Sequence, residues 1–474
     1  MSSLFESLYW KSPIWLQQVA VALWGVGWYR RRFSPAFHRW VRELREHNAW
    51  TAEQFRSYQE TRLASIFEAA WSSRYYPEVF TAAGIGRGMD PWKAIAAAPL
   101  LSKETLRTRG DELLTRARLP RGTRPFTTSG STGTPAHIYY TPEFHPLDSA
   151  LRETRCYSAA GVTYRDRRFM CGGRKICRFD QDRPPFWRFS PMENMAYASA
   201  YHLSPRFLPD YVAFLRRYRP AIVSGYPSAL GSIARYALER GVLPAPARMI
   251  FTCAETVLPR DREAMEAAWQ CRVFDCYGAT ELCVFINQCQ FGRYHASPDV
   301  GIVEILDRRG QPCPPGVIGE LVCTGLQNWL QPLIRYRTGD AAAWAHDQHC
   351  DCGRQMPIVE AIEGRMDDLL YTSDGRQVGR VDHIFKGIRN LKEAQVVQQR
   401  LDRIQIYVVP AAGYSEEDSR TIRDNMRLHL GDVDVRVEAV EAIARTPAGK
   451  FRAVLCQLSA EERLRCQGNP IERD

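Results

Sequence analysis

The spacing of hydrophobic and polar residues divides the chain into three parts. In the first part, residues 1–110, Ala-rich and Glu/Arg-rich stretches such as 51–70 have a helical pattern and little strand character. We therefore expect these residues to form the mostly helical N-terminal part of a large domain.

Short apolar runs bounded by turn residues begin near residue 120. Residues 221–225, 248–253 and 273–277 are rich in β-branched and aromatic residues, and a helical segment at 228–240 separates the first two. Strands that alternate with helices indicate an α/β fold with a parallel sheet.

Two further strands are predicted at 301–306 and 319–325, joined by the turn-rich segment 307–316. Such a connection favours antiparallel pairing. We therefore expect a large α/β domain of parallel and mixed sheets with a small β-barrel-like subdomain. Residues 111–366 should form its core.

The C-terminal part predicts a strand, a helix and a second strand. The strand at 404–409 is followed by Ser415, a helix N-cap before three acidic residues, and Gly431 is a typical helix end. Residues 433–440 then alternate as a strand. We expect a small α+β domain over 367–474.

The length of the chain predicts two or more domains. A chain of 474 residues exceeds the length over which one hydrophobic core usually grows. The net charge of +10 comes from scattered arginines and suits anionic ligands. The sequence shows no basic face with interleaved aromatic residues, so we expect no nucleic-acid partner. The 14 cysteines are dispersed and no signal sequence precedes them, so we expect a reducing cytoplasm.

Residues 15–33 are the segment that fits contact with a membrane. The apolar run 19–28 is too short to span a bilayer, and Arg30, Arg31 and Arg32 follow it. A helix at the membrane surface with Trp and Arg anchors is one interpretation. We favour a helix packed on the protein's own core, because hydrophobic side chains are more often buried.

A loop rich in hydroxyl groups and glycine occupies residues 127–135, with the sequence Thr-Thr-Ser-Gly-Ser-Thr-Gly-Thr-Pro. Backbone N–H groups and hydroxyls of such a loop can surround a phosphate. It lacks the Lys-Ser/Thr pair of a P-loop. The alternative is a surface turn. The candidate ATP-binding residues here are Thr128, Ser129, Gly130, Ser131, Thr132, Gly133 and Thr134.

Further signatures follow in order at 277–281 (Tyr-Gly-Ala-Thr-Glu), 336–340 (Tyr-Arg-Thr-Gly-Asp), 364–368 (Gly-Arg-Met-Asp-Asp) and 446–450 (Thr-Pro-Ala-Gly-Lys). With the loop, they resemble the superfamily of acyl-CoA synthetases, adenylation domains and luciferases. The chain is most similar to the branch of phenylacetate-CoA ligases, coenzyme F390 synthetases and capsule-biosynthesis proteins. The resemblance implies a large N-terminal domain and a small mobile C-terminal domain.

The resemblance also implies an activity. ATP would activate a carboxylic acid as an acyl-adenylate with release of pyrophosphate, and a thiol, that of CoA, would then take the acyl group. An amine, a hydroxyl or a carrier protein as the acceptor stays open, as do an inactive nucleotide-binding scaffold and a homodimeric assembly. The small-molecule acid itself is not identified.

The resemblance assigns the catalytic roles to a few residues. Glu281 would bind Mg²⁺, Thr280 would contact the α-phosphate, and Lys450 would bridge the carboxylate and the α-phosphate. A hard cation on a carboxylate and phosphate oxygens is ordinary magnesium chemistry, and a lysine suits a mobile point charge. The alternatives are a helix-start carboxylate for Glu281 and a surface lysine for Lys450.

Other positions are assigned to the nucleotide and to domain movement. Asp340 would accept hydrogen bonds from both ribose hydroxyls. Asp367 would be the hinge between the domains. The adenine pocket and the remaining ATP contacts would involve Ala254, Glu255, Tyr277, Gly278 and Arg365.

The resemblance also indicates an acid pocket. Tyr140 and the segment Tyr226, Pro227 and Ser228 occupy positions similar to the acid-pocket segments of aryl ligases. An aromatic lining would favour aryl or short acids over long fatty acids.

Four residues have the chemistry of a structural zinc site. Cys350 and Cys352 lie on a Gly-containing turn, and Cys289 and His295 lie upstream. Relatives look similar here. Cys313 and His349 are rival ligands, and buried reduced cysteines are the alternative to any metal site.

Overall fold

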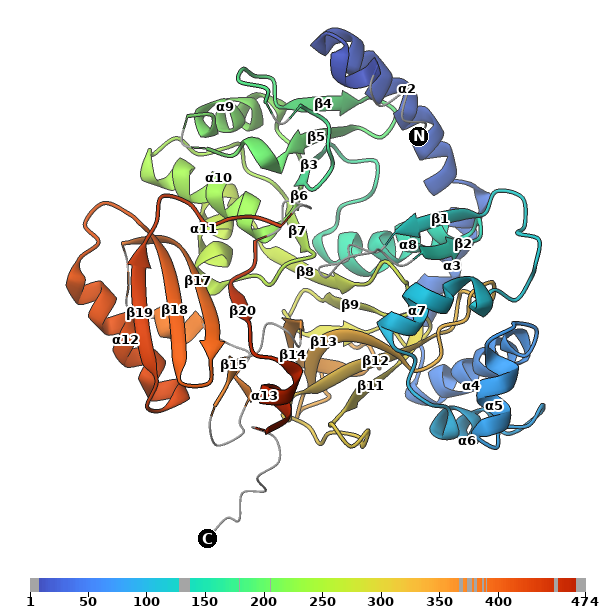
Figure 1. The fold of residues 1–474 in the computed structure, drawn as a ribbon. Helices are drawn as coiled ribbons and strands as arrows, with labels where there is room; N and C mark the ends of the chain where they lie inside the picture. Colours follow the sequence, from blue (N-terminus) through green and yellow to red (C-terminus); the bar gives the residue numbers. More distant parts are fainter. Residues whose placement is uncertain are drawn as a thin grey trace. The chain divides into compact units, whose positions relative to one another are not determined.

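The computed structural model (Figure 1) describes residues 8–127, 137–178, 180–204, 206–365, 370–372, 377–378, 382–385, 388, 390–446 and 451–465. Internal contacts divide the chain into two compact units. The larger unit comprises Met1–Thr338 and Ala342–Ile362, and the smaller unit comprises residues 339–341 and 363–474.

The N-terminal part of the larger unit is helical, as predicted. Its helices are α2 (Ile14–Arg32), α3 (Pro35–His47), α4 (Ala52–Ala70), α5 (Tyr76–Ala82), α6 (Pro91–Ala97) and α7 (Lys103–Arg109). Local signals explain where they start. Thr51 and Gln54 form a reciprocal capping box at α4, and Ser102 caps α7.

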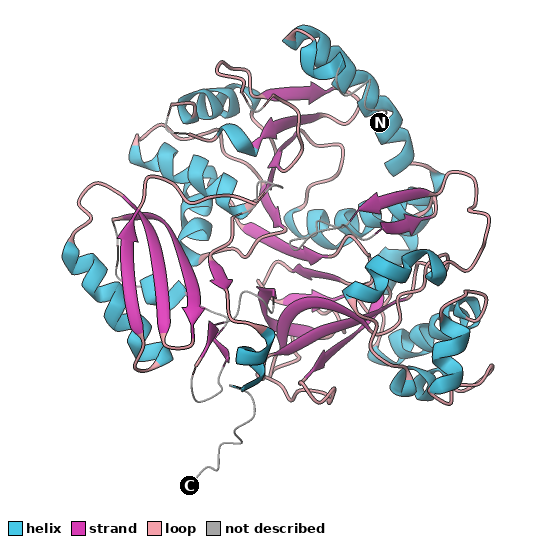
Figure 2. Ribbon diagram, viewed as in Figure 1, coloured by secondary structure: helices cyan, strands magenta, loops and turns pink. Residues whose placement is uncertain are grey.

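A mixed sheet of twelve strands forms the centre of the larger unit (Figure 2). Its order is β11-β12-β13-β14-β10-β9-β8-β7-β6-β3-β5-β4. The strands are β3 (Arg168–Gly172), β4 (Trp187–Ser190), β5 (Met195–Ser199), β6 (Ile222–Gly225), β7 (Met249–Cys253), β8 (Val273–Gly278), β9 (Phe285–Gln288), β10 (Tyr294–Ala296), β11 (Gly301–Leu306), β12 (Gly319–Gly325), β13 (Tyr336–Trp344) and β14 (Ile358–Arg365).

The strands β5, β3, β6, β7 and β8 run parallel to one another, which confirms the predicted parallel sheet. Their carboxyl ends therefore lie at one edge. The predicted antiparallel pair is also confirmed, with Gly301 opposite Gly325 in β11 and β12. These strands continue the same large sheet.

Both faces of the parallel strands are buried. Val223 and Ile250 belong to a core with α9 (Leu208–Tyr218), α10 (Pro227–Glu239) and α11 (Pro259–Trp269). Their neighbours Ile222 and Met249 belong to another core with α3 and α8 (Phe144–Leu151). This alternation explains why the strands read as continuous apolar runs.

Helix α2 lies beside the edge strand β4 (Figure 1). Gln17, Val21 and Gly25 are buried, as expected for packing on the protein itself. The opposite face is different, since Trp15 and Leu23 are 67% and 69% exposed. Among the described residues, no helix has the length and apolar character needed to cross a membrane.

A separate hairpin of β1 (Arg124–Thr127) and β2 (His137–Tyr140) flanks residues 128–136. The strands are antiparallel, with Thr127 opposite His137. The candidate ATP-binding residues Thr128 to Thr134 lie outside the described residues. After α8, the chain continues through a π-helical segment, Arg152–Cys156.

The smaller unit contains a four-stranded sheet in the order β19-β18-β17-β20. Ser415 and Asp418 form a capping box, and Gly431 ends the helix, as predicted. Ile422 and Met426 bury that helix against Ile406. The elements are β15 (Leu370–Tyr371), β16 (Gln377–Val378), β17 (Leu391–Arg400), β18 (Arg403–Pro410), α12 (Glu416–Leu430), β19 (Asp434–Ala439), β20 (Val454–Cys456) and α13 (Ala460–Arg465).

Candidate active site

The ends of β6 and β7 bring the predicted acid pocket and adenine pocket together. The backbone N–H of Ser228 donates a 3.1 Å hydrogen bond to Oε2 of Glu255. Ser228 lies in the first turn of α10, and Glu255 follows β7. A carboxylate is stabilised at a helix N-terminus. Ligands of open α/β sheets bind at this carboxyl edge of the strands.

The turn after β6 depends on Gly225. Its φ is +154°, and a Cβ there would lie 1.9 Å from the carbonyl oxygen of Cys171. The next N–H, that of Tyr226, donates to the same carbonyl oxygen at 3.0 Å. Tyr226 is the N-cap residue of α10 and Pro227 follows it, so the predicted pocket segment forms the start of this helix.

Tyr226 is half-buried near Glu255. Burial, and then the charge of Glu255, raise the pKa of the Tyr226 phenol. The phenol therefore stays protonated, as a hydrogen-bonding group on an aromatic wall.

Two residues that are not glycine have positive φ in the loops after β7 and β8. Ala254 has a φ of +72° and Leu282 a φ of +44°. Such residues are rare outside glycine, and backbone strain of this kind gathers at functional sites. Ala254 directly precedes Glu255, and Leu282 directly follows Glu281. Both predicted acidic residues therefore adjoin strained backbone.

Glu281 is buried at 7% exposure, and its Oε1 accepts a 2.8 Å hydrogen bond from the hydroxyl of Tyr336. Within the described residues, Oε2 has no hydrogen bond. The neighbouring Thr280 is exposed, as is Gly278 at the end of β8, while Tyr277 is half-buried. A fixed carboxylate with one oxygen unbonded beside an exposed hydroxyl fits a small hard cation and its phosphate ligands.

Tyr140, a predicted acid-pocket residue, lies close enough to Glu281 for the charge of this carboxylate to act on its phenol. Its ring stacks on Phe144 with centroids 3.5 Å apart, and Phe126 lies 5.1 Å away. Burial and the charge of Glu281 raise the pKa of its phenol. Among the described residues, the buried hydroxyl has no hydrogen-bond partner.

Asp340 lies in β13, and its side chain is partly exposed. Its neighbour Arg337 donates hydrogen bonds to Glu320, with Nη2–Oε2 at 2.7 Å. This pairing raises the pKa of Arg337. The guanidinium is therefore held on Glu320.

Three predicted positions are only partly described or lie outside the described residues. Arg365 ends β14, and nothing is established for its side chain. The hinge residue Asp367 and the lysine Lys450 lie outside the described residues. Their roles stay predictions.

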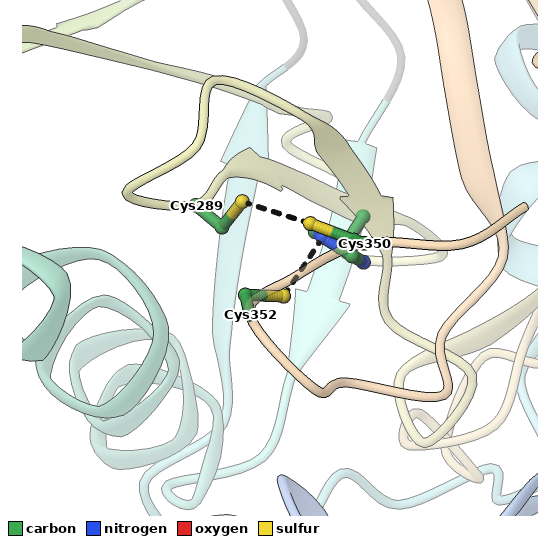
Figure 3. A group of neighbouring side chains, drawn as sticks. Cys289, Cys350 and Cys352 are labelled. Atoms are coloured by element: carbon green, nitrogen blue, oxygen red, sulfur yellow. Dashed lines mark hydrogen bonds between the residues drawn. The ribbon is translucent and has the colours of Figure 1, made fainter.

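The four predicted zinc ligands lie together, and Figure 3 shows the three cysteines of this group. Their ligand atoms are all within 4.8 Å of one another. Sγ of Cys289 is 3.6 Å from Sγ of Cys350, and Sγ of Cys352 is 3.3 Å from Nε2 of His295. A positive φ at Gly353, +77°, and its N–H bond to the Cys350 carbonyl close the turn.

The rival ligands are placed elsewhere. The His349 side chain is 80% exposed and pairs with Asp351 at 3.6 Å. Cys313 packs beside Gly319 between β11 and β12. Three sulfur atoms and one imidazole nitrogen are a common tetrahedral zinc set.

The electrostatics of the cluster also fit a cation. Burial acts to raise the pKa of Cys289, but hydrogen bonds from His295 and from the backbone N–H groups of Phe291 and Arg293 outweigh it and lower the pKa. Burial and the nearby thiols raise the pKa of Cys352 to about 12. Nδ1 of His295 is buried with no partner among the described residues. Closely packed thiols gain most from a cation that binds them as thiolates.

Two supporting features escaped the sequence analysis. Tyr336 stood inside a recognised signature, but no role was assigned to it. Asp275, which accepts hydrogen bonds from Thr252 at 2.7 Å and Tyr294 at 2.8 Å, joins β7, β8 and β10. Burial raises its pKa, and these bonds oppose that effect. A carboxylate within an apolar strand was the available signal.

Comparison with known proteins agrees with this geometry. Residues 184–329 match the family "AMP-binding enzyme", and residues 370–457 match the CapK C-terminal domain. Protein CapK of Staphylococcus aureus is 25% identical over 95% of this chain and 98% of its own length. A phenylacetate-coenzyme A ligase of Thermus thermophilus is 30% identical over 34% of this chain and 37% of its own.

Solved structures share the fold. A 2-hydroxyisobutyryl-CoA ligase in the postadenylation state has a TM-score of 0.67 at 20% identity, over 88% of this chain and 92% of that chain. Both family matches and the match to CapK over nearly the whole chain lead to one assignment. The chain belongs to the acyl-adenylate-forming superfamily, in the branch of CapK and the phenylacetate-CoA ligases.

Proposed function

We propose that this protein uses ATP to convert a carboxylic acid into an acyl-adenylate, with release of pyrophosphate, and then transfers the acyl group to a thiol, that of CoA. The observation that carries the proposal is Glu281, a buried carboxylate oriented by Tyr336 and followed by strained backbone. Membership of the superfamily supports adenylation. The acid and the acceptor are the open parts.

In the first half-reaction, an oxygen of the substrate carboxylate attacks the α-phosphorus of ATP, and the bond from this phosphorus to the pyrophosphate oxygen breaks. Mg²⁺ held by Glu281 would neutralise the negative charge of the phosphates. The hydroxyl of Thr280 would donate to an α-phosphate oxygen. The resemblance gives Asp340 the ribose hydroxyls and Lys450 the charge that develops between the two anions.

The adenine ring of ATP and the substrate carboxylic acid would bind at the strand ends. Tyr277 offers a half-buried ring for stacking on adenine, and the turn at Ala254 presents its backbone there. Tyr140, Phe144 and Tyr226 offer aromatic surface for the acid, which favours an aryl or short acid. Arg365 and the loop with Thr128 to Thr134 would complete the ATP site.

In the second half-reaction the thiol displaces AMP from the acyl carbon. A thiol is a strong nucleophile once deprotonated, so no catalytic serine is needed. On the resemblance, the smaller unit turns at Asp367 between the half-reactions. Such a change would carry Lys450 away once the adenylate has formed.

A second acceptor class has support of its own. The match to CapK covers 95% of the chain, whereas the match to the Thermus ligase covers 34%. The ligases alone would indicate CoA as the acceptor, but the full-length likeness is to CapK. An amine, hydroxyl or carrier-protein acceptor is therefore the alternative to CoA.

The deciding experiment measures acid-dependent pyrophosphate release over a broad panel of aryl and short acids, with and without CoA. Release that requires one acid class and thioester formation that saturates with CoA would support the main proposal. Adenylate formation without any CoA-dependent thioester would favour the alternative acceptor. No pyrophosphate release with any acid would favour an inactive nucleotide-binding scaffold.

We also propose that Cys289, His295, Cys350 and Cys352 bind one structural zinc ion. Four protein ligands leave no position for substrate. The zinc would join the β9–β10 hairpin to the loop before β14. Metal analysis of the purified protein tests this assignment.

A further inference from the structure

Helix α2 turns its hydrophobic side chains to solvent. Trp15, Val19 and Leu23 are 67%, 45% and 69% exposed, and a spacing of four residues places them along one side of the helix. Leu16 is exposed beside them. We call these four residues the outward face of α2. The other exposed large hydrophobic residues of the described chain are mostly scattered over separate elements.

The side of α2 that packs on the protein makes polar contacts besides burying Val21 in a hydrophobic core. The Gln18 side-chain amide donates to the Phe189 carbonyl at 2.5 Å and accepts from the Phe189 N–H at 2.9 Å. The buried carbonyl of Gln17 accepts from Arg188 at 2.6 Å. These bonds fix the rotation of the helix about its axis, so the outward face cannot turn inward without leaving buried polar groups unpaired.

Gly25 confirms how closely this side fits. A Cβ at Gly25 would lie 2.0 Å from Oγ of Ser190 on β4. The side of α2 against the protein thus combines polar and apolar contacts, while its outward face is apolar. An exposed apolar face of this kind marks a surface that meets another apolar phase.

The segment that contains α2 carries only positive charges, and the buried Glu193 of the neighbouring segment pairs with Arg32 at the C-terminal end of α2. From residue 8 to residue 42 the sequence has no Asp or Glu, and its charged residues are Lys11, Arg30, Arg31, Arg32, Arg39 and Arg42. Lys11 and Arg30 are exposed at the two ends of the outward face. Arg174 lies 5.1 Å from the ring of Trp24 and 5.7 Å from that of Trp28.

We propose that the outward face of α2 binds the surface of a bilayer containing anionic phospholipid. The helix would lie in the plane of the membrane, with Trp15, Val19 and Leu23 at the boundary of headgroups and acyl chains. Lys11 and Arg30 would contact the headgroup phosphates. Tryptophan and basic residues that flank an apolar stripe are typical of such helices.

A second copy of the chain fits the same face less well. A two-fold interface brings identical patches together, so the basic ends of two α2 helices would meet with no acidic residue from this segment to pair them. Anionic headgroups supply the complementary charge.

The test is sedimentation of the full-length protein with vesicles of phosphatidylcholine alone and of phosphatidylcholine mixed with phosphatidylglycerol. We expect binding to the mixed vesicles that weakens as salt is added. Leu23→Glu should weaken partitioning by about tenfold or more, since it removes an apolar contact and adds a repelled charge. Arg30→Glu should weaken binding to the mixed vesicles.

Val317→Glu is the matched control, because Val317 is 46% exposed and lies elsewhere in the larger unit. It should bind like the unaltered protein. Because Leu23 is exposed, circular dichroism and the melting temperature should not change in Leu23→Glu.

Two results would overturn the proposal. One is the absence of binding to the mixed vesicles. The other is binding that Leu23→Glu and Val317→Glu weaken equally. A dimer in light scattering that Leu23→Glu converts to a monomer, without vesicle binding, would assign the face to a second copy instead.

Discussion

The hydroxyl of Tyr336 donates a 2.8 Å hydrogen bond to the carboxylate of Glu281, and both side chains are buried. The two residues come from different recognised signatures. The bond therefore joins the loop after β8 to the start of β13. It orients one carboxylate oxygen, Oε1.

Tyr336→Phe should lower the rate of acid-dependent pyrophosphate exchange by about tenfold to a hundredfold, because a hydrogen bond to a charged group contributes roughly 1.5–3 kcal/mol. Tyr76→Phe is the matched control. The Tyr76 hydroxyl also donates a buried 2.8 Å bond, to the Pro332 carbonyl. This control should lower stability but leave the exchange rate of folded protein unchanged. Equal exchange rates for Tyr336→Phe and the unaltered protein would contradict the role of Tyr336.

Lys450→Ala should abolish formation of the adenylate but leave preformed acyl-adenylate able to react with the acceptor. The reason is that the lysine charge is needed where the carboxylate meets the α-phosphate. Each half-reaction is measured separately, with Lys392→Ala, an exposed lysine on β17, as the control. An unchanged rate for the first half-reaction would exclude this role.

Cys350→Ser should remove one equivalent of zinc and lower the melting temperature, since metal binding contributes to folding. The adenylation rate per folded molecule should stay the same. Elemental analysis and thermal unfolding check the two effects, and Cys313→Ser should retain the metal. Unaltered protein that contains no zinc after purification in zinc-supplemented medium would refute the site.

His145→Phe should make stability less dependent on acid. Burial lowers the pKa of His145 from 6.5 to about 4, with Arg32, Arg31 and Arg124 adding to the effect and Asp148 opposing it. The unfolded chain therefore binds a proton between these pH values that the folded chain does not. Stability falls as the pH falls from 6.5 towards 4.

Near pH 5 this linkage lowers the free energy of unfolding of the unaltered protein by about 2 kcal/mol. Urea unfolding at pH 7 and pH 5 measures it. The loss between these pH values should be smaller in His145→Phe. Parallel losses in both proteins would show that His145 is not the group responsible.

Much of the fold could be predicted because local and long-range signals agree. The runs that became β6, β7 and β8 are apolar on both faces, and the cap at Ser415 and the glycine at Gly431 mark α12 directly. Strand β17 was missed. Its polar residues, such as Gln395 and Gln398, obscure the alternation of apolar and polar positions. Gln398 can be buried because its side-chain amide forms hydrogen bonds with the backbone N–H and carbonyl of Tyr371.

The site could be predicted as a set of residues but not as a geometry. The four candidate zinc ligands were identified by residue type, and the choice against His349 needed its position in space. The bond between Tyr336 and Glu281 joins residues 55 positions apart, which no local pattern encodes. The exposed apolar face of α2 was also hidden, because an apolar run favours burial, whereas hydrogen bonds of Gln17 and Gln18 hold the helix with that face outward.

The amide of Gln18 has a further effect on the large sheet. Strand β4 is the last strand of that sheet, and Gln18 occupies both hydrogen-bonding groups of Phe189. An uncovered strand edge is a template for pairing with strands of other molecules. Helix α2 thus protects the edge of β4 from such pairing and aggregation. A protein that lacks residues 1–33 would expose this edge.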